Sequence, residues 1–225
     1  MSSPVEAAVV ETAAAVFPPP GVRVVVFDVV GTLIEPRPPV AVAYQRAAAR
    51  HGVHLDADKI RRRFRSAWRR QEAVDAAAFP PFATSRDREA CRWRAIVEEV
   101  FAGMPSADGI FSDLWRHFGT VEAWGSLDRG RELVRLALEA GTTVALASNF
   151  DERLQAIAGA IEPLSWVPLV FPSSEIGWRK PALEFLGTIE ERLGCRPGET
   201  LLVGDDPDLD VRAALRAGWQ ALAVG

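Results

Sequence analysis

A chain of 225 residues is long enough for one large domain, or for a core domain with a smaller one inserted into it. Its 48% apolar and 25% charged residues are ordinary for a globular protein, and the formal net charge of −4 argues against a global attraction to nucleic acid or to an anionic membrane. The two distant cysteines form no Cys/His cluster, and neither a membrane-spanning apolar run nor a secretory signal is visible, so we expect a cytoplasmic protein without structural zinc.

The first predicted elements place an aspartate at the end of a strand. Residues 1–20 are rich in Ala and Val and end in three prolines, which indicates a flexible N-terminal arm. Residues 22–27 form a β-branched and aromatic run, which is typical of a buried parallel strand. Asp28 follows this strand directly. Three prolines between residues 36 and 39 then predict a stiff connection into another module.

The segment 37–119 predicts helices only, because its apolar residues have helical spacing and no strand pattern. The expected helices are 40–50, one that Asp56 caps and that continues to about 76, one that Ser85 caps and that continues to about 101, and 107–118. We therefore expect an all-helical domain inserted into the core.

From residue 120 the chain alternates between predicted helices and strands. The expected strands are 143–147, 169–171, 200–203 and 221–224, and the expected helices are 127–140, 151–160, 181–193 and 209–217. This alternation is typical of a doubly wound parallel sheet with helices on both faces. The predicted fold class is therefore α/β, with a core made of residues 21–36 and 120–225 and a helical insert made of residues 37–119.

Reactive side chains follow four of the predicted strands. In an open α/β sheet, the ligand crevice lies beyond the carboxyl ends of the strands. The residues expected there are Asp28, Gly31 and Thr32 after the first strand, Ser148 and Asn149 after the second, Lys180 beyond the third, and Asp205, Asp206, Asp208 and Asp210 after the fourth. The sheet therefore directs a carboxylate, a hydroxyl, an ammonium group and an acidic cluster to one place, although Asp206 and Asp208 are expected to face solvent or to cap a helix.

These groups are suited to phosphoryl transfer. A carboxylate such as that of Asp28 can attack an electrophile and form a covalent intermediate. Converging carboxylates repel each other unless a hard cation lies between them, and magnesium prefers oxygen ligands together with substrate phosphate. Ser148 and the backbone N–H groups near Val29 and Val30 can bind phosphoryl oxygens, while Lys180 can neutralise negative charge. Lys180 is one of two lysines among 26 basic residues, which favours a functional role for it.

Four short segments resemble the motifs of the haloacid dehalogenase superfamily. They are Phe27-Asp28-Val29-Val30-Gly31-Thr32-Leu33 for the first motif, Ala147-Ser148-Asn149 for the second, Arg179-Lys180-Pro181 for the third, and Val203-Gly204-Asp205 with Asp210 for the fourth. Because all four occur in order at the expected strand ends, residues 22–224 are identified as a member of this superfamily. The helical insert is similar to a cap of the first cap class, and the sequence resembles the branch related to the rhythmically expressed gene product of flies.

The resemblance implies a Rossmann-like core, a magnesium cofactor and a role for each matching residue. The residues implied to act on the substrate are Asp28 as the nucleophile, Ser148, Asn149 and Lys180. The residues implied to hold magnesium are Asp28, the backbone carbonyl of Val30, Asp205 and, as a supporting acid, Asp210. The expected substrate is a small phosphorylated molecule, and the sequence decides neither its identity nor the oligomeric state.

Val30 departs from the family pattern. Phosphatases of this superfamily usually have a second aspartate at this position, where it protonates the leaving oxygen and later activates water. General acid–base catalysis contributes on the order of 10²–10⁴-fold, so a protein with valine there is expected to be slow, to favour good leaving groups, to use an acid from the cap, or to lack catalysis.

Three other functions stay open for this reason. A 2-haloacid dehalogenase also lacks the second aspartate and needs no metal, but the acidic cluster would then have no role. A phosphonate hydrolase would need a lysine in the cap, for which Lys59 is the sole candidate. A non-catalytic binding protein on the same fold is the third alternative.

Residues 59–70 hold seven basic side chains around Ile60, Phe64 and Trp68. The spacing i, i+4, i+8 favours a helix that buries these three apolar residues, with one or two of the arginines able to reach an anionic substrate. A patch that binds polyanions is the alternative. Trp93 and Trp124, in or near the predicted cap, are candidates for lining the substrate cavity.

Overall fold

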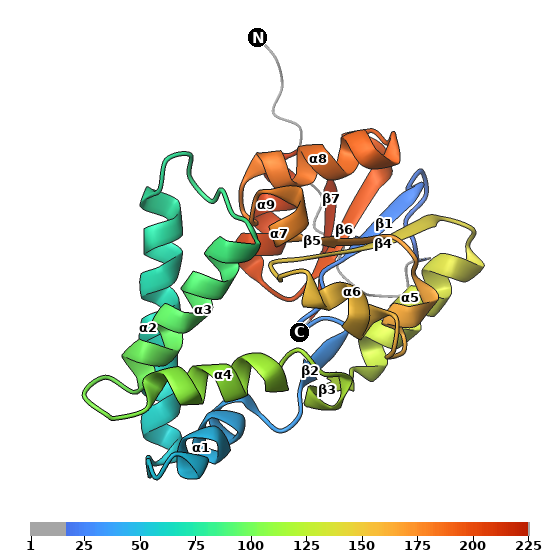
Figure 1. Ribbon diagram of the computed structural model, residues 1–225. Helices are drawn as coiled ribbons and strands as arrows, with labels where there is room; N and C mark the ends of the chain where they lie inside the picture. The colour runs from blue at the N-terminus through green and yellow to red at the C-terminus, as the bar shows by residue number, and fades with distance from the viewer. Residues whose placement is uncertain (1–16, 225) are drawn as a thin grey trace.

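A computed structural model describes residues 17–224, so most of the predicted N-terminal arm, residues 1–20, lies outside the described residues. A parallel sheet with helices on both sides forms one part of the molecule, and a group of four helices lies beside it (Figure 1). Among residues 17–224, no helix is both long enough and apolar enough to cross a membrane.

The main sheet has five parallel strands in the order β5-β4-β1-β6-β7. Their bounds are β1 (Val24–Phe27), β4 (Thr143–Ser148), β5 (Val170–Pro172), β6 (Thr200–Gly204) and β7 (Gln220–Ala223). The central strand is β1, in which Val26 lies opposite Ala145 of β4 and Leu202 of β6. The chain therefore winds outward from β1 in both directions, and ligands bind at such a switch point in doubly wound folds.

Helices cover both faces of this sheet, as the sequence predicts. On one face, Val25 packs in the same core as Val134 of α5 (Asp128–Glu139) and residues of α6 (Arg153–Ala158). On the other, Val26 packs with Phe185 of α8 (Leu183–Leu193) and with residues of α7 (Ser173–Ile176) and α9 (Ala213–Arg216). Since both faces of β1 are buried, the strand is a continuous apolar run rather than an alternating one.

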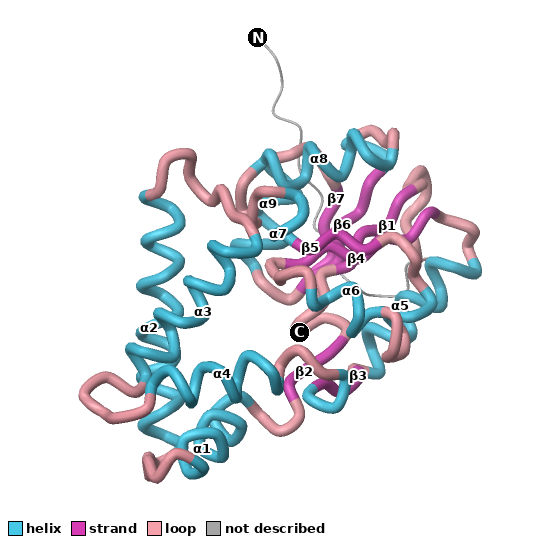
Figure 2. Tube along the Cα trace, viewed as in Figure 1, coloured by secondary structure: helices cyan, strands magenta, loops and turns pink. Residues whose placement is uncertain are grey.

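The insertion, defined here as residues 40–117, consists of four helices, and Figure 2 shows only helix and loop in it. The helices are α1 (Val40–Arg50), α2 (Ala57–Ala77), α3 (Arg86–Val100) and α4 (Ala107–His117). The predicted caps are present, because Asp56 accepts hydrogen bonds from the N–H groups of residues 58 and 59, and Ser85 accepts one from that of residue 88. A separate apolar core that includes Tyr44, Ile60 and Ile96 holds these helices together. The domain limits at 37 and 119 and the first cap class remain predictions.

A short ribbon that the sequence did not indicate joins the insertion to the core. β2 (Ile34–Pro36) and β3 (Trp124–Ser126) pair antiparallel, with Glu35 opposite Gly125. Pro36, which we expected in a stiff connection, therefore ends a strand. Each strand has three residues and its partner is distant in the sequence, so no local pattern could reveal the pairing. A 3-10 turn, η1 (Val121–Ala123), precedes β3.

The segment after β6 differs most from its prediction. The expected helix 209–217 is a π-helical segment (Pro207–Arg212) followed by the short α9. The side chain of Asp206 caps it by accepting from the N–H groups of residues 208 and 209, and its carbonyl accepts from those of residues 210 and 211. Asp208 is exposed and pairs with Arg212, so Asp206 and Asp208 cap a helix and face solvent, as expected.

Smaller differences occur at other helix ends. Helix α6 is shorter than predicted, and α8 begins at Leu183 rather than at Pro181. The remaining short elements are η2 (Leu164–Trp166) and η3 (Pro197–Glu199).

Two helical glycines test how closely the core is packed. A Cβ on Gly130 of α5 would lie 2.2 Å from the carbonyl oxygen of Thr32 and 2.8 Å from a methyl carbon of Leu33, whereas a Cβ on Gly187 of α8 would have no atom within 4 Å. We expect Gly130→Ala to lower the free energy of unfolding by about 1–3 kcal/mol through overpacking. Gly187→Ala should raise it by up to about 1 kcal/mol through helix propensity. Urea denaturation measures both, and a stabilising Gly130→Ala would contradict the packing described.

Candidate active site

Asp28 lies at the carboxyl end of β1, in the middle of the sheet. Its backbone N–H donates to the carbonyl of Val203 in β6 at 2.8 Å, and its residue is 6% exposed. In the turn that follows, Gly31 has a φ of +94°, which favours glycine, and a Cβ there would lie 2.4 Å from Oδ2 of Asp205. The turn therefore brings the backbone at residue 31 directly against Asp205.

Three carboxylates meet beyond the ends of β1 and β6. Oxygen atoms of Asp28, Asp205 and Asp210 lie within 4.8 Å of one another. Asp210 is buried and accepts from the backbone N–H of Asp206 at 3.1 Å, while Asp205 is exposed and accepts from the hydroxyl of Thr32 at 3.2 Å. Because oxygen ligands this close together suit a hard divalent cation, these residues could hold one.

Lys180 places its ammonium group between two of these carboxylates. Its Nζ donates to Oδ1 of Asp28 at 2.6 Å and to Oδ1 of Asp210 at 2.5 Å, and the side chain is 2% exposed. The hydroxyl of Ser148, at the end of β4, donates to the same Oδ1 of Asp28 at 3.2 Å. Ser148 and Lys180 thus fix one oxygen of Asp28 in place, and no hydrogen bond of the described residues involves its other oxygen, Oδ2.

The electrostatics of this cluster are unbalanced, because three carboxylates face one ammonium group. Burial is the largest cause that raises the pKa of Asp28, and with Asp210 and Asp205 it brings this pKa to about 7 against the opposing effect of Lys180. Burial alone would lower the pKa of Lys180, but Asp210 and Asp28 outweigh it and raise the pKa. Burial and Asp210 also raise the pKa of Asp205. The donor set therefore fits a bound divalent cation, which would oppose the excess negative charge.

Asn149 holds the backbone of Lys180. Its Nδ2 donates to the carbonyl of Lys180 at 2.9 Å, and its Oδ1 accepts from the N–H of Lys180 at 2.8 Å. The sequence suggested Asn149 as a substrate-binding residue. Since both polar ends of its amide are engaged with Lys180, the structure favours a positioning role, although the residue also lines the cavity described next.

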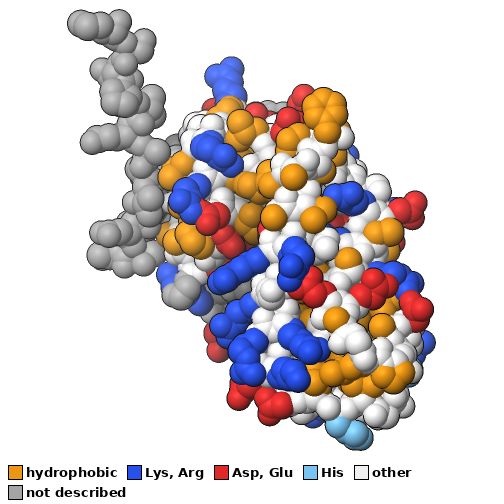
Figure 3. All heavy atoms as spheres, turned by 90° about the vertical axis from the view of Figure 1, so that its left-hand side faces the viewer, with side chains coloured by type: hydrophobic (Ala, Val, Ile, Leu, Met, Phe, Trp, Pro, Cys, Tyr) orange, Lys and Arg blue, Asp and Glu red, His pale blue; other side chains and the backbone are white. Residues whose placement is uncertain are grey.

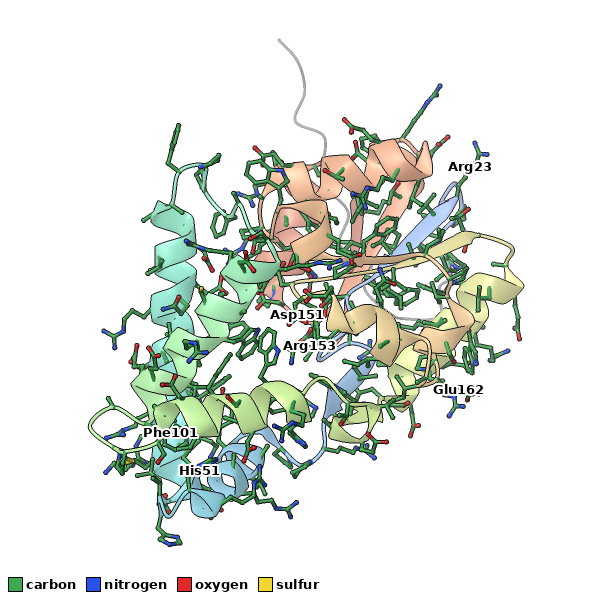
Figure 4. The ribbon with its side chains drawn as sticks, in the orientation of Figure 1. Arg23, His51, Phe101, Asp151, Arg153 and Glu162 are labelled. Carbon is green, nitrogen blue, oxygen red and sulfur yellow. The ribbon has the colours of Figure 1, made fainter. Side chains whose placement is uncertain are left out.

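A cavity of about 390 Å³ lies between the core and the insertion. Val30 lines it from the core side, so the position of the missing acid faces this space. Asp151 and Arg153 line it as well, where the insertion meets the core in Figure 4. Trp93 and Trp124 are both in its wall, as the sequence suggested. A cavity of this size, with Val30 and Asn149 in its wall close to Asp28 and Ser148 in the chain, is suited to a small molecule.

Arg179, the residue before Lys180, connects the core to the insertion and had no predicted role. Its Nη1 donates to both carboxylate oxygens of Glu89 in α3, at 2.6 and 2.8 Å, and both side chains are buried. Asp75 of α2 accepts from Nε of Arg92 at 2.8 Å and has Nε of Arg179 at 3.7 Å. Arg179 and Glu89 are 90 positions apart in the sequence, so no local pattern indicates that they pair. The one available signal was that Arg179 is a basic residue adjacent to Lys180.

Comparison with known proteins places related sequences over most of the chain. A family described as haloacid dehalogenase-like hydrolase matches residues 22–218. The human haloacid dehalogenase-like hydrolase domain-containing protein 3 is 30% identical over 209 residues, which cover 90% of this chain and 82% of that protein. The rhythmically expressed gene 2 protein of Drosophila melanogaster is 24% identical over 218 residues, covering 90% and 82%. These matches confirm the resemblance inferred from the four motifs.

Solved structures share the fold at lower identity. YfnB of Bacillus subtilis, described as a HAD-hydrolase and solved with magnesium, has a TM-score of 0.66 at 18% identity, covering 90% of this chain and 88% of its own. The defluorinating L-2-haloacid dehalogenase Rha0230 has a TM-score of 0.69 at 21% identity, covering 89% and 80%. A HAD phosphatase from Thermococcus onnurineus has a TM-score of 0.59 at 19% identity, covering 90% and 86%. The predicted α/β fold is confirmed, and phosphatases and dehalogenases both share it.

The two lysines of the chain provide a matched test of the charge balance at Asp28. Lys180→Met leaves three carboxylates without their ammonium partner, so we expect the free energy of unfolding to fall by about 3–5 kcal/mol at neutral pH without divalent cations. The loss should shrink at lower pH, because protonation removes the uncompensated charge. Lys59→Met, at an exposed position, should change stability by less than about 0.5 kcal/mol. Equal effects of the two substitutions would contradict the role assigned to Lys180.

Proposed function

This chain belongs to the haloacid dehalogenase-like hydrolase family, and on that premise we propose that it is a magnesium-dependent phosphatase of small molecules that acts through a phosphorylated Asp28. One observation carries the proposal: Asp28 shares its site with Asp205 and Asp210, and Lys180 alone cannot balance three carboxylates. Attack on carbon by a single aspartate needs no such acidic cluster, whereas a metal site for phosphoryl transfer does.

Asp28 would act as the nucleophile. One carboxylate oxygen forms a bond to phosphorus while the bond from phosphorus to the leaving oxygen breaks, and that oxygen departs with the electron pair. Its partners on Oδ1, Ser148 and Lys180, keep the carboxylate oriented, and Lys180 also neutralises charge on the phosphoryl group. Water then attacks the phosphorus of the aspartyl-phosphate, which releases phosphate and restores the carboxylate, with the proton passing to solvent.

The residues that would hold magnesium are Asp28, the backbone carbonyl of Val30, Asp205 and, in a supporting role, Asp210. When bound there, magnesium would screen the anionic nucleophile from the anionic phosphoryl group.

Val30 limits the leaving groups that this site can release. Among the described residues that line the cavity, the one carboxylate is that of Asp151, and it accepts hydrogen bonds from the backbone N–H, Nε and Nη2 of Arg153. No free carboxylic acid of these residues is thus available to protonate a departing alkoxide. We therefore infer a preference for aryl or acyl phosphates, whose leaving groups tolerate negative charge.

A 2-haloacid dehalogenase is the second candidate. Val30 favours it, because dehalogenation needs no second aspartate, and dehalogenases are among the proteins that share the fold. Asp28 would then attack carbon and displace halide without a metal.

A cytoplasmic location is also part of the proposal, and the two free cysteines, Cys91 and Cys195, are consistent with it.

Asp28→Asn tests the nucleophile. An amide keeps the shape of the side chain but is a poor nucleophile, so we expect phosphatase activity at background level with an unchanged fold by circular dichroism. Asp208→Asn, at an exposed aspartate in the segment that follows β6, is the control and should retain activity. A chelator in excess should stop turnover of phosphate esters by the wild type. Conversely, full activity on 2-haloacids in chelator would establish the dehalogenase and rule out the phosphatase.

Val30→Asp tests the missing proton donor. A carboxylic acid at this position should raise kcat/KM most for alkyl phosphates, because their leaving oxygen needs a proton. The ratio of kcat/KM for an aryl to an alkyl phosphate should be high in the wild type and should fall by up to roughly 10²-fold in the variant, the lower end of the range for general acid–base catalysis. Val30→Asn is the control of similar size that cannot donate an acidic proton. A wild type that already prefers alkyl phosphates would mean that another group supplies the proton.

A further inference from the structure

The wall of the cavity beside Val30 is mostly aromatic. Nine aromatic side chains line it. In the insertion, Trp68 lies between Phe64 and Trp93, with ring centroids 6.1 and 5.6 Å away. At the side nearer the core, Trp124 lies between Phe118 and Phe150, at 5.9 and 5.6 Å. Aromatic rings that line a cavity of about 390 Å³ from both the insertion and the core favour a flat aromatic ligand.

Two arginines on the insertion side of the same cavity have no acidic partner among residues 17–224. Arg65 and Arg69 are one turn apart on α2, are exposed and line the cavity. Neither makes an ion pair or a side-chain hydrogen bond with any residue in the described range 17–224. Their neighbours differ: Arg61 pairs with Asp58, and Arg70 pairs with Glu99.

The unpaired state of Arg65 and Arg69 has a physical cost. Like charges at i and i+4 on a helix repel by roughly 0.2–0.5 kcal/mol. Figure 3 shows Lys and Arg side chains gathered on the face of the molecule where α2 and α3 lie, with Asp and Glu side chains beside some of them. Arg153, by contrast, is neutralised by Asp151 and lies over the ring of Trp115. Arg65 and Arg69 are therefore the cations in the cavity wall that remain available to an anion.

We propose that the cavity binds a substrate whose leaving group is an aromatic ring system with a second anionic group, and that Arg65 and Arg69 bind this group while the phosphoryl group lies at Asp28. The proposal rests on the proposed phosphatase function and names its substrate class. It agrees with Val30, because an aromatic leaving oxygen departs without a proton donor. It also assigns the insertion a role in substrate binding, since guanidinium groups bind carboxylate or phosphate through paired hydrogen bonds.

Matched substrates and variants test the anion site. The probes are 2-naphthyl phosphate and 6-carboxy-2-naphthyl phosphate, which differ by one carboxylate. We expect the wild type to prefer the carboxylated ester in kcat/KM by about 10- to 100-fold, the range for charge-assisted hydrogen bonds. The double variant Arg65→Gln, Arg69→Gln should lose this preference, mainly through a higher KM for the carboxylated ester. Arg62→Gln, an exposed arginine of the same helix outside the cavity wall, is the control and should keep the preference.

A binding measurement separates this proposal from the phosphatase itself. The tryptophans of the cavity should report binding of 2-naphthoate to the wild type through fluorescence quenching, without any turnover. We expect 2-naphthoate to bind several-fold more tightly than octanoate, and the double variant to weaken its binding. Arginine-dependent binding of 2-naphthoate without phosphatase activity would overturn the proposed function but retain the ligand class. Phosphatase activity with no carboxylate preference, or with a preference that the double variant keeps, would overturn the ligand class alone.

Discussion

The buried ammonium group of Lys180 is the interaction on which the site depends. It lies 2.6 Å from Asp28 and 2.5 Å from Asp210, at the point where β1 and β6 end. Without this cation, burial of those carboxylates so close together would be strongly unfavourable. Asn149 fixes the backbone of Lys180 from the end of β4, so three strands contribute to the position of one charge. The remaining negative charge, chiefly that of the exposed Asp205, is what makes the site suited to a divalent cation.

The insertion is connected to this charge balance through Arg179, the residue that precedes Lys180 in the chain. Arg179 forms a buried ion pair with Glu89 of α3, and it comes immediately before Lys180. The segment that positions the ammonium group of Lys180 is therefore also the segment that anchors the insertion to the core. On the opposite side, the ribbon of β2 and β3 joins the same two parts. Between these two contacts lies the cavity, which Val30, two residues after Asp28, lines from the core and Arg65 and Arg69 of α2 line from the insertion.

The sequence predicted the features that local chemistry determines. β1 was predictable because a strand buried on both faces is an apolar run, and the caps Asp56 and Ser85 because capping involves only adjacent residues. The convergence of Asp28, Ser148 and Lys180 followed from the rule that parallel strands end at one edge. β2 pairs with β3, and Arg179 pairs with Glu89. Both pairings join segments that are distant in the sequence through a few residues, so no periodic pattern predicts them. The spacing of α2 predicted its apolar stripe but not the elements that the stripe faces, so Trp93 and Trp124 were predictable as cavity residues whereas Phe64 and Trp68 were not.

In the proposed reaction, Asp28 carries the phosphoryl group during turnover. Rapid acid quenching of the wild type with magnesium and an aryl phosphate, followed by mass spectrometry of its peptides, tests this claim directly. The account predicts that the peptide containing Asp28 gains the mass of one phosphoryl group and that omission of magnesium prevents the gain. Release of phosphate with Asp28 unmodified throughout turnover, or a phosphoryl group on a different residue, would contradict it. An Asp28 peptide that instead gains the carbon skeleton of a 2-haloacid would identify a dehalogenase.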